Sequence, residues 1–318
     1  MASRPAQGHS IPALPMLLER GVTNAELKAE AKRIAGEVEN VFAFYLAGPG
    51  DGRDRLFDAM RHAGLGGGKR LRPLLTVATG RLFGLSEDRV IRAGAAIEAI
   101  HVYSLIHDDL PCMDDDDLRR GKPTVHRAFD ESTAVLAGDC FHDLAFEIIA
   151  DPATHEDPFV RSELVLEMAR ASGPHGMAGG QMLDLAAEGR SLDIGSVSRL
   201  QQLKTGALIE FAVEAACIMG RLPAEGRTPY RGFARDIGLA FQIADDLLDH
   251  AGDEAVAGKR LRKDADAGKA TFVSLLGEER ARQQCGFLVR QAVEHLQDHG
   301  AEADLLRAVA RYVEERDR

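Results

Sequence analysis

Residues 105–117 read LIHDDLPCMDDDD, and residues 241–249 read FQIADDLLD. Each stretch places a pair of aspartates at the end of an apolar run with helical spacing. The leading aspartates, Asp108 and Asp245, lie 245 − 108 = 137 positions apart in a chain of 318 residues. A repeated helical unit would explain this echo, although one sequence does not establish it. The two stretches predict two helices, each with an acidic cluster at its end.

The second stretch has the simpler geometry. Asp245 and Asp249 stand at positions i and i+4 and therefore share one helix face, with Gln242 one turn earlier. Like charges at this spacing repel each other by about a few tenths of a kcal/mol. A solvated acidic face is the ordinary interpretation, but the neighbouring residues are apolar. We favour a bound divalent cation, which would explain why the repulsion is tolerated.

The first stretch is denser in acids, with Asp108, Asp109 and four more aspartates at 114–117. Pro111 cannot sit inside a regular helix without breaking it. We therefore expect a helix bulge at Pro111–Cys112 that turns Asp114 back toward Asp108.

A calcium loop is the obvious alternative for the first stretch. An EF-hand beginning at Asp114 needs Gly at its sixth position and Glu at its twelfth, where the sequence has Arg119 and Val125. Carboxylates without a dedicated cage are instead typical of magnesium that is shared with substrate phosphate. The acidic stretches therefore predict a magnesium site rather than a calcium site.

Basic runs accompany both acidic stretches and also follow a glycine run, GGGKRLRP at 66–73. Arginine forks suit diphosphate oxygens, and glycines allow close backbone approach. The glycine run is no P-loop, because Ala63 stands where its first Gly is needed and Arg70 where Ser or Thr should follow Lys. The basic residues are Lys69, Arg70 and Arg72, then Arg119, Arg120 and Lys122, and finally Lys259, Arg260, Arg262, Lys263 and Lys269.

Composition excludes several classes of partner. The formal net charge is −11, which argues against nucleic acid and against an anionic membrane surface. The four cysteines are widely spaced and fit neither a disulfide framework nor a zinc site. The sequence has no apolar run of about 18 residues, and its first residues have no sustained apolar stretch. We therefore expect a cytoplasmic protein with neither a secretory signal nor a membrane span.

Helical periodicity dominates from about residue 24 to the end, and no clean strand alternation occurs. We expect a flexible segment at 1–23 and one domain at 24–318. Spacing between turn signals predicts helices mostly of 15 to 25 residues, which suits a helical bundle.

Five motifs in order resemble the trans-isoprenyl diphosphate synthases. They are GGKRLRP at 67–73, LIHDDLPCMDDDDLRRGKPTVH at 105–126, GMAGGQMLDL at 176–185, LKTGALI at 203–209 and FQIADDLLD at 241–249. The resemblance covers essentially the whole chain from about residue 25. It implies a single large helical bundle around a deep central cavity, a homodimer, and three Mg²⁺ ions per active site.

The resemblance also assigns roles to residues. The implied metal ligands are Asp108, Asp109, Asp114, Asp245, Asp246 and Asp249, with Asp246 and Asp249 acting mainly through water. The residues implied to bind the allylic diphosphate are Arg119, Lys204, Gln242 and Lys259. The residues implied to bind isopentenyl diphosphate are Gly68, Lys69, Arg72, His101 and Arg120. We add Thr205, Phe241 and Lys269 to the predicted substrate site, and expect carbonyls near Lys204–Thr205 and the Gln242 amide oxygen to stabilise positive charge.

The expected reaction condenses isopentenyl diphosphate with dimethylallyl and then geranyl diphosphate. Magnesium and basic side chains would stabilise the departing diphosphate, and a dry cavity would shield the carbocation. A loop such as residues 252–268 could close that cavity.

Product length depends on Tyr103 and Ser104, the residues five and four before the first aspartate. The Tyr, together with the Pro111–Cys112 insertion, resembles bacterial farnesyl diphosphate synthases, so we favour a fifteen-carbon product over the twenty carbons of a geranylgeranyl diphosphate synthase. His250, after the second motif, departs from the usual aliphatic residue, and its meaning stays open.

Three other functions compete with a synthase. A terpene cyclase needs no second diphosphate site, a non-catalytic regulatory subunit should lose charged motif residues, and a metal-buffering protein leaves the arginines unexplained. All the charged motif residues that we sought are present.

Overall fold

The computed structural model describes residues 21–187, 189–190, 192–252 and 270–315. Its α-helices are α1 (Asn24–Tyr45), α2 (Asp54–Gly64), α3 (Leu71–Leu82), α4 (Glu87–Asp108), α5 (Val125–Ala128), α6 (Glu131–Ala150), α7 (Pro158–Ser172), α8 (Met177–Ala187), α9 (Ile194–Gln201), α10 (Ala207–Met219), α11 (Thr228–Ala251), α14 (Phe272–Leu276), α15 (Glu278–Glu294) and α16 (Asp304–Glu315). Short turns of other helix types lie at Gln202–Gly206 (π), Ala224–Arg227 (3-10) and Ala301–Ala303 (3-10). The predicted all-α bundle is confirmed.

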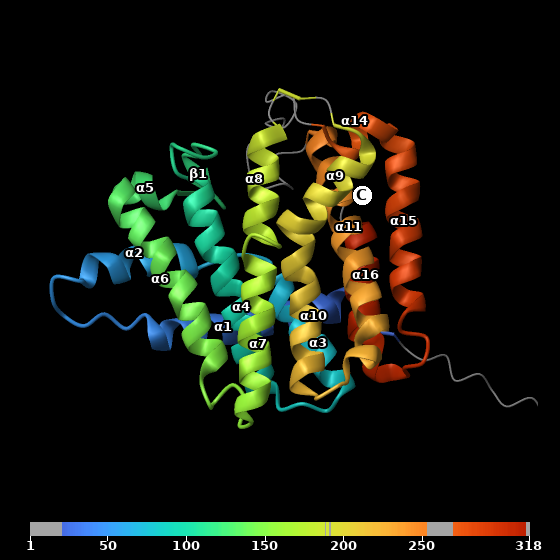
Figure 1. Ribbon diagram of the computed structural model, residues 1–318, viewed down its shortest axis with the longest axis horizontal. Helices are drawn as coiled ribbons and strands as arrows, with labels where there is room; N and C mark the ends of the chain where they lie inside the picture. Colours follow the sequence, from blue (N-terminus) through green and yellow to red (C-terminus); the bar gives the residue numbers. More distant parts are fainter. Residues whose placement is uncertain (1–20, 188, 191, 253–269, 316–318) are drawn as a thin grey trace, which may run out of the picture.

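Most of the long helices, among them α4, α6, α10, α11 and α15, stand side by side with nearly parallel axes, while α1 runs across behind them (Figure 1). α4 and α10 are apolar around most of their circumference, which is typical of helices at the centre of a bundle. α4 packs against α3 and α6, while α10 packs against α3, α7 and α11. α11 also packs against α15 and α16, which lie on the right of Figure 1, opposite α6.

Local sequence signals explain where several helices begin. Thr23 forms a capping box with Glu26, so α1 begins at residue 24, where we expected the domain to start. Asp130 caps α6, and Asp157 caps α7 just before a proline at its first turn. Most of the predicted flexible segment, at residues 1–20, lies outside the described residues.

The expected helix lengths were wrong for several helices. α1, α4, α6 and α11 have 20 to 24 residues, but α3 has 12 and α8 has 11. The chain also forms a small hairpin of two strands, β1 (Leu118–Arg119) and β2 (Lys122–Pro123). Arg120 and Gly121 at its tip both have positive φ, 53° and 75°, as a tight two-residue turn requires. Strands of two residues are too short to give an alternating pattern.

The expected bulge at Pro111–Cys112 was also wrong in form. α4 ends at Asp108, and the chain then turns back on itself. The backbone N–H of Asp114 donates to the Asp108 carbonyl over 2.8 Å, which closes this turn. The consequence that we expected is nevertheless present, because Asp114 returns to the neighbourhood of Asp108.

Among the described helices, none combines the length and the apolar character needed to cross a membrane.

Candidate active site

One cavity of about 290 Å³ is lined by both acidic stretches. α4 and the turn after it contribute Asp108, Asp114 and Asp116, and the last turns of α11 contribute Asp245, Asp246 and Asp249. Gln242, one turn earlier on α11, lines the same cavity. The prediction that Asp245, Asp249 and Gln242 share one helix face is therefore confirmed.

The donor set suits magnesium. Carboxylate oxygens are the ligands that this hard cation prefers, and it commonly completes its shell with water and phosphate oxygens. Within the described residues, no three acidic, His or Cys side chains come close enough to hold an ion by themselves. Burial raises the pKa of Asp108 to about 6, and the neighbouring Asp114 adds to the effect while Lys204 opposes it. A bound cation would offset the cost of keeping this carboxylate ionised.

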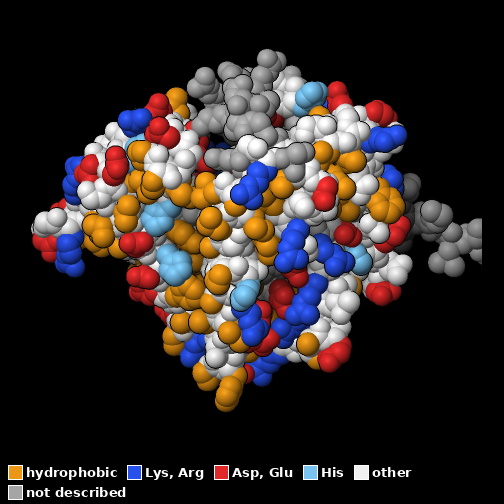
Figure 2. All heavy atoms as spheres, turned by 45° about the horizontal axis from the view of Figure 1, so that its top comes forward, with side chains coloured by type: hydrophobic (Ala, Val, Ile, Leu, Met, Phe, Trp, Pro, Cys, Tyr) orange, Lys and Arg blue, Asp and Glu red, His pale blue; other side chains and the backbone are white. Residues whose placement is uncertain are grey.

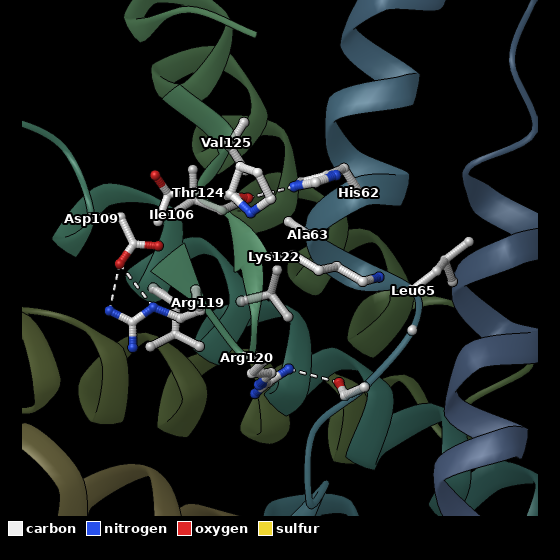
Figure 3. A pocket seen from close by; sticks show the side chains of 15 residues that line it. His62, Ala63, Leu65, Ile106, Asp109, Arg119, Arg120, Lys122, Thr124 and Val125 are labelled. Carbon is white, nitrogen blue, oxygen red and sulfur yellow. Dashed lines mark hydrogen bonds and ion pairs between the residues drawn. The ribbon is translucent and has the colours of Figure 1, made fainter. Parts of the chain in front are cut away.

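Asp109 points away from this cavity. Its side chain is buried and accepts a hydrogen bond from Arg119 Nε over 2.8 Å and another from Arg119 Nη2 (Figure 3). Burial raises the pKa of Asp109, and Arg119 works against that effect. Arg119 Nη2 also lies 3.3 Å from Asp116 Oδ2. Asp109 and Asp116 thus hold Arg119 at the cavity edge, and the predicted metal-binding role of Asp109 stays a prediction.

The wall opposite the acids contains a π-helical turn, Gln202–Gly206, which supplies Lys204 and Thr205 to the cavity. Such turns are rare and occur often at functional sites. The Lys204 ammonium lies 2.7 Å from Asp184 on α8. A Cβ on Gly180 would come within 2.2 Å of the Lys204 backbone nitrogen, so only glycine allows α8 to approach the turn so closely.

Gln242 has a partner that the sequence did not suggest. Its amide nitrogen donates to Oε1 of Gln201, over 2.6 Å, and both side chains line the cavity. The Gln242 carbonyl oxygen takes no part in this hydrogen bond, and its predicted role in stabilising positive charge stays a prediction.

A second basic cluster lies around His101 and comprises Arg70, Arg72 and Arg120. Glu98 acts on both Arg72 and Arg120, and the Arg119-bound Asp109 also acts on Arg120. Burial holds the pKa of His101 well below its usual range, and Arg72 and Arg120 add to the effect. Burial also lowers the pKa of Arg72, whose Nε is buried without a hydrogen-bond partner in the described part of the chain. This cluster is suited to bind an anion without a metal.

Gly68 belongs to this cluster by contact, since a Cβ there would lie 2.5 Å from the Arg120 guanidinium. Lys69 and Phe241 line a different, mostly apolar cavity of about 140 Å³ between α1, α3, α11 and α16. Their roles in substrate binding stay predictions. Lys259 and Lys269 lie outside the described residues, as does most of the loop expected to close the site, and His250 is exposed near the end of α11.

Tyr103 lies among aromatic rings between α4 and α6. Its ring makes edge contacts with His107 and His142, with centroids 5.8 Å and 5.2 Å apart. Burial raises the pKa of its hydroxyl, with a smaller effect from Asp108. Ser104 donates to the His101 carbonyl within the same helix over 2.9 Å. Their predicted influence on product length stays a prediction.

The polyprenyl synthetase family model matches residues 53–312 of this chain. The chain belongs to the polyprenyl synthetase family. It is 44% identical to the farnesyl diphosphate synthase of Escherichia coli (strain K12) over 266 residues, which cover 82% of this chain and 89% of that protein. It is also 44% identical to geranylgeranyl pyrophosphate synthase 11 of Arabidopsis thaliana over 245 residues, 75% of this chain and 68% of that protein.

A solved structure supports the same assignment. The apo crystal structure of an FPP/GFPP synthase from Zymomonas mobilis superposes with a TM-score of 0.84 and 53% sequence identity, covering 92% of this chain and all of that one. The family membership and the all-α fold are thus established together.

Sequence reasoning missed several residues of the site. Asp116 and Gln201 line the acidic cavity, Asp184 binds Lys204, and Glu98 faces the basic cluster. Asp184 and Glu98 carried a signal, because each is an acid inside an otherwise apolar helical stretch. Gln201 carried none, because only the fold brings it to Gln242.

Proposed function

We propose that this chain is a farnesyl diphosphate synthase, which condenses isopentenyl diphosphate with dimethylallyl diphosphate and then with geranyl diphosphate. The observation that carries the proposal is the presence of two anion sites of different chemistry. One is a carboxylate-lined cavity suited to a metal-bound diphosphate, and the other is the basic cluster around His101. An enzyme that joins two diphosphates needs one to be ionised and the other only held.

Magnesium, when bound, would neutralise the charge that develops on the departing diphosphate. Asp108, Asp114 and Asp245 would hold it, with Asp246 and Asp249 in supporting positions. Asp246 Oδ2 also accepts the backbone N–H of Phe272 over 2.7 Å, so it fixes the start of α14 as well. The family resemblance implies three ions per site.

Lys204 and Arg119 would hold the allylic diphosphate, since both are cations at the cavity wall. The ion pairs with Asp184 and Asp109 fix their positions before substrate arrives, which lowers the reorganisation needed for catalysis. Thr205 and the Gln242 carbonyl oxygen would stabilise the allylic cation. Arg72, Arg120 and neutral His101 would hold isopentenyl diphosphate.

Fifteen carbons is the proposed product length. The half-buried Tyr103 ring between two histidine rings would form the floor of the pocket. Overall identity does not decide the length, because this chain is equally identical to the farnesyl and geranylgeranyl synthases named above. A geranylgeranyl diphosphate synthase is therefore the second candidate.

We also propose a homodimer formed through the face of α6, α7 and α8. Large apolar side chains are exposed on this face, and Figure 2 shows hydrophobic side chains gathered there. They include Val135, Leu136, Phe159, Leu166, Met182 and Leu183. An exposed apolar face of this extent is typical of a protein interface.

We place the protein in the cytoplasm, because its four cysteines are free thiols, as a reducing compartment favours.

The test is incubation of purified protein with dimethylallyl and isopentenyl diphosphates, with Mg²⁺ or with a chelator. We expect farnesyl diphosphate only when Mg²⁺ is present, and analytical ultracentrifugation should show a dimer. A twenty-carbon product would support the second candidate. Absence of any prenyl product would refute the synthase, and conversion of geranyl diphosphate alone into a hydrocarbon would indicate a cyclase.

A further inference from the structure

The loop between α2 and α3 has an unusual backbone. Gly66, Gly67 and Gly68 have φ angles of 90°, 136° and 117°, and Arg70 has a φ of 44° although it carries a side chain. Glycine adopts positive φ readily, but a left-handed φ is uncommon at a residue with a side chain such as Arg70, and it persists when the surrounding structure over-determines it. Because Gly68 contacts Arg120 and Arg72 follows closely on the chain, the shape of this loop sets the geometry of the basic cluster.

Three side chains hold the loop. Glu39 Oε1 accepts the backbone N–H groups of Gly66 and Gly67, over 3.2 Å and 3.3 Å. Arg120 Nη1 donates to the Gly67 carbonyl over 2.7 Å, a bond drawn in Figure 3. Arg70 Nη2 donates to the Gly64 carbonyl over 2.6 Å and so joins the two ends of the loop.

Arg70 is itself fixed from α4. Its Nη1 lies 2.9 Å from Glu98 Oε1, and both side chains are only 1% exposed. Its guanidinium also lies over the ring of Phe42, with 5.8 Å between the guanidinium carbon and the centroid. Glu98 stands one helical turn before His101, so the same helix anchors the loop and presents the histidine.

The second oxygen of Glu98 is buried without a hydrogen-bond partner in the described part of the chain. Its charge acts favourably on both Arg72 and Arg120, which burial would otherwise disfavour. Glu98 is therefore the counter-charge that lets three arginines gather behind the loop.

We propose that Glu98 and Arg70 are positioning residues for the metal-free diphosphate site, which they shape by locking the 64–68 loop and by balancing Arg72 and Arg120. This inference rests on the proposed function. Neither residue needs to touch the substrate, because both side chains are buried and Arg70 holds the loop through the Gly64 carbonyl. Buried ion pairs contribute little net stability compared with apolar replacements, so stability alone gives weak reason for this pair.

The decisive variant replaces both partners, Arg70→Met with Glu98→Met, so that neither member of the ion pair stays buried without the other. Arg72 and Arg120 lose the balancing charge of Glu98, and the melting temperature shows whether the variant is still folded. We expect its KM for isopentenyl diphosphate to rise about tenfold or more, since small misplacement of binding groups costs up to about a hundredfold. The KM for geranyl diphosphate should change by less than about twofold.

A second variant, Glu98→Gln, keeps the shape of the side chain and removes its charge. It should show the same selective rise in the KM for isopentenyl diphosphate, and it decides the question if the double variant does not fold. The control is Arg227→Met with Glu163→Met, a less buried pair at 2.6 Å whose residues line neither the acidic cavity nor the cavity beside Arg120. Neither KM should change in the control.

Wild-type KM values in a folded double variant, or equal rises for both substrates, would overturn the proposal. Calorimetric binding of isopentenyl diphosphate in the presence of a chelator provides a separate readout. If the wild type binds it without metal but forms no product, the proposed function fails and the positioning role can still be tested by affinity.

Discussion

Asp108 should limit the stability of the metal-free protein, and the Asp108→Asn substitution tests this directly. Burial raises the pKa of Asp108 from 3.8 to about 6, with Lys204 opposing the effect and Asp114 adding to it. Above pH 6 the folded protein must therefore keep an ionised carboxylate in a place that disfavours it. Asn has nearly the same shape and never carries the charge.

The magnitude follows from the pKa difference between the folded and unfolded states. The folded pKa lies above the unfolded one, so the stability gained by proton binding is fully present below pH 3.8 and is lost as the pH rises through about 6. The pKa difference between the folded and unfolded states is 6 − 3.8 = 2.2, and a pKa difference of one corresponds to about 1.36 kcal/mol of free energy. Asp108→Asn should therefore increase the free energy of unfolding by up to about 3 kcal/mol at pH 8 and by about half of that at pH 5.

The assay is urea unfolding of both proteins in the presence of a chelator, at pH 5 and pH 8. Asp298→Asn is the control, because Asp298 is exposed and should leave the free energy of unfolding unchanged. Excess Mg²⁺ should stabilise the wild type more than the variant, and the variant should lose nearly all prenyltransferase activity. If Asp108→Asn is no more stable than the wild type at pH 8 without metal, the reasoning about its burial is wrong.

Three further predictions concern the rest of the site. Gly180→Ala should lower kcat by about a hundredfold and the free energy of unfolding by about 1 to 3 kcal/mol, because the new Cβ must move more than 1 Å away from the Lys204 backbone. The control Gly36→Ala, which has open space around its Cβ, should leave kcat unchanged. A wild-type kcat in Gly180→Ala would refute the close approach of α8 to the π turn. Asp184→Asn should raise the KM for the allylic substrate by about tenfold through loss of its ion pair with Lys204, as measured by steady-state kinetics, and an unchanged KM would contradict that role. Tyr103→Ala should lengthen the products seen by chromatography, and an unchanged product profile would reject Tyr103 as the pocket floor.

Much of the acidic site could be predicted because its geometry is local. The i and i+4 spacing of Asp245 and Asp249 needs only a helix to place both carboxylates in one cavity, and the structure has that helix. Pro111 correctly signalled that the chain departs from the helix, but proline chemistry does not distinguish a bulge from a helix end. Hydrogen bonding from Asp114 to Asp108 decided between these forms, and no pattern of residue types encodes it.

The parts that escaped prediction depend on packing between distant segments. Asp184 and Lys204 are 20 residues apart, and they meet because Gly180 lets α8 touch the following segment. Asp109 shares its motif with Asp108 but faces Arg119, because adjacent residues at a helix end point in different directions. Helix lengths also escaped prediction, since packing decides where weakly signalled helix ends fall.

The π-helical turn at Gln202–Gly206 has a consequence for how this chain could change in evolution. A π turn contains one residue more than the α-helical turn that it replaces. Deleting a single residue between α9 and α10 could therefore restore a continuous helix and leave the local backbone well formed. α10 would keep the side that it buries, because the π turn and the α turn that replaces it each complete one circuit of the helix. The cavity wall would change instead, since Lys204 and Thr205 both lie within the π turn. The extra residue is therefore retained for the shape of the active site and not for the packing of the core.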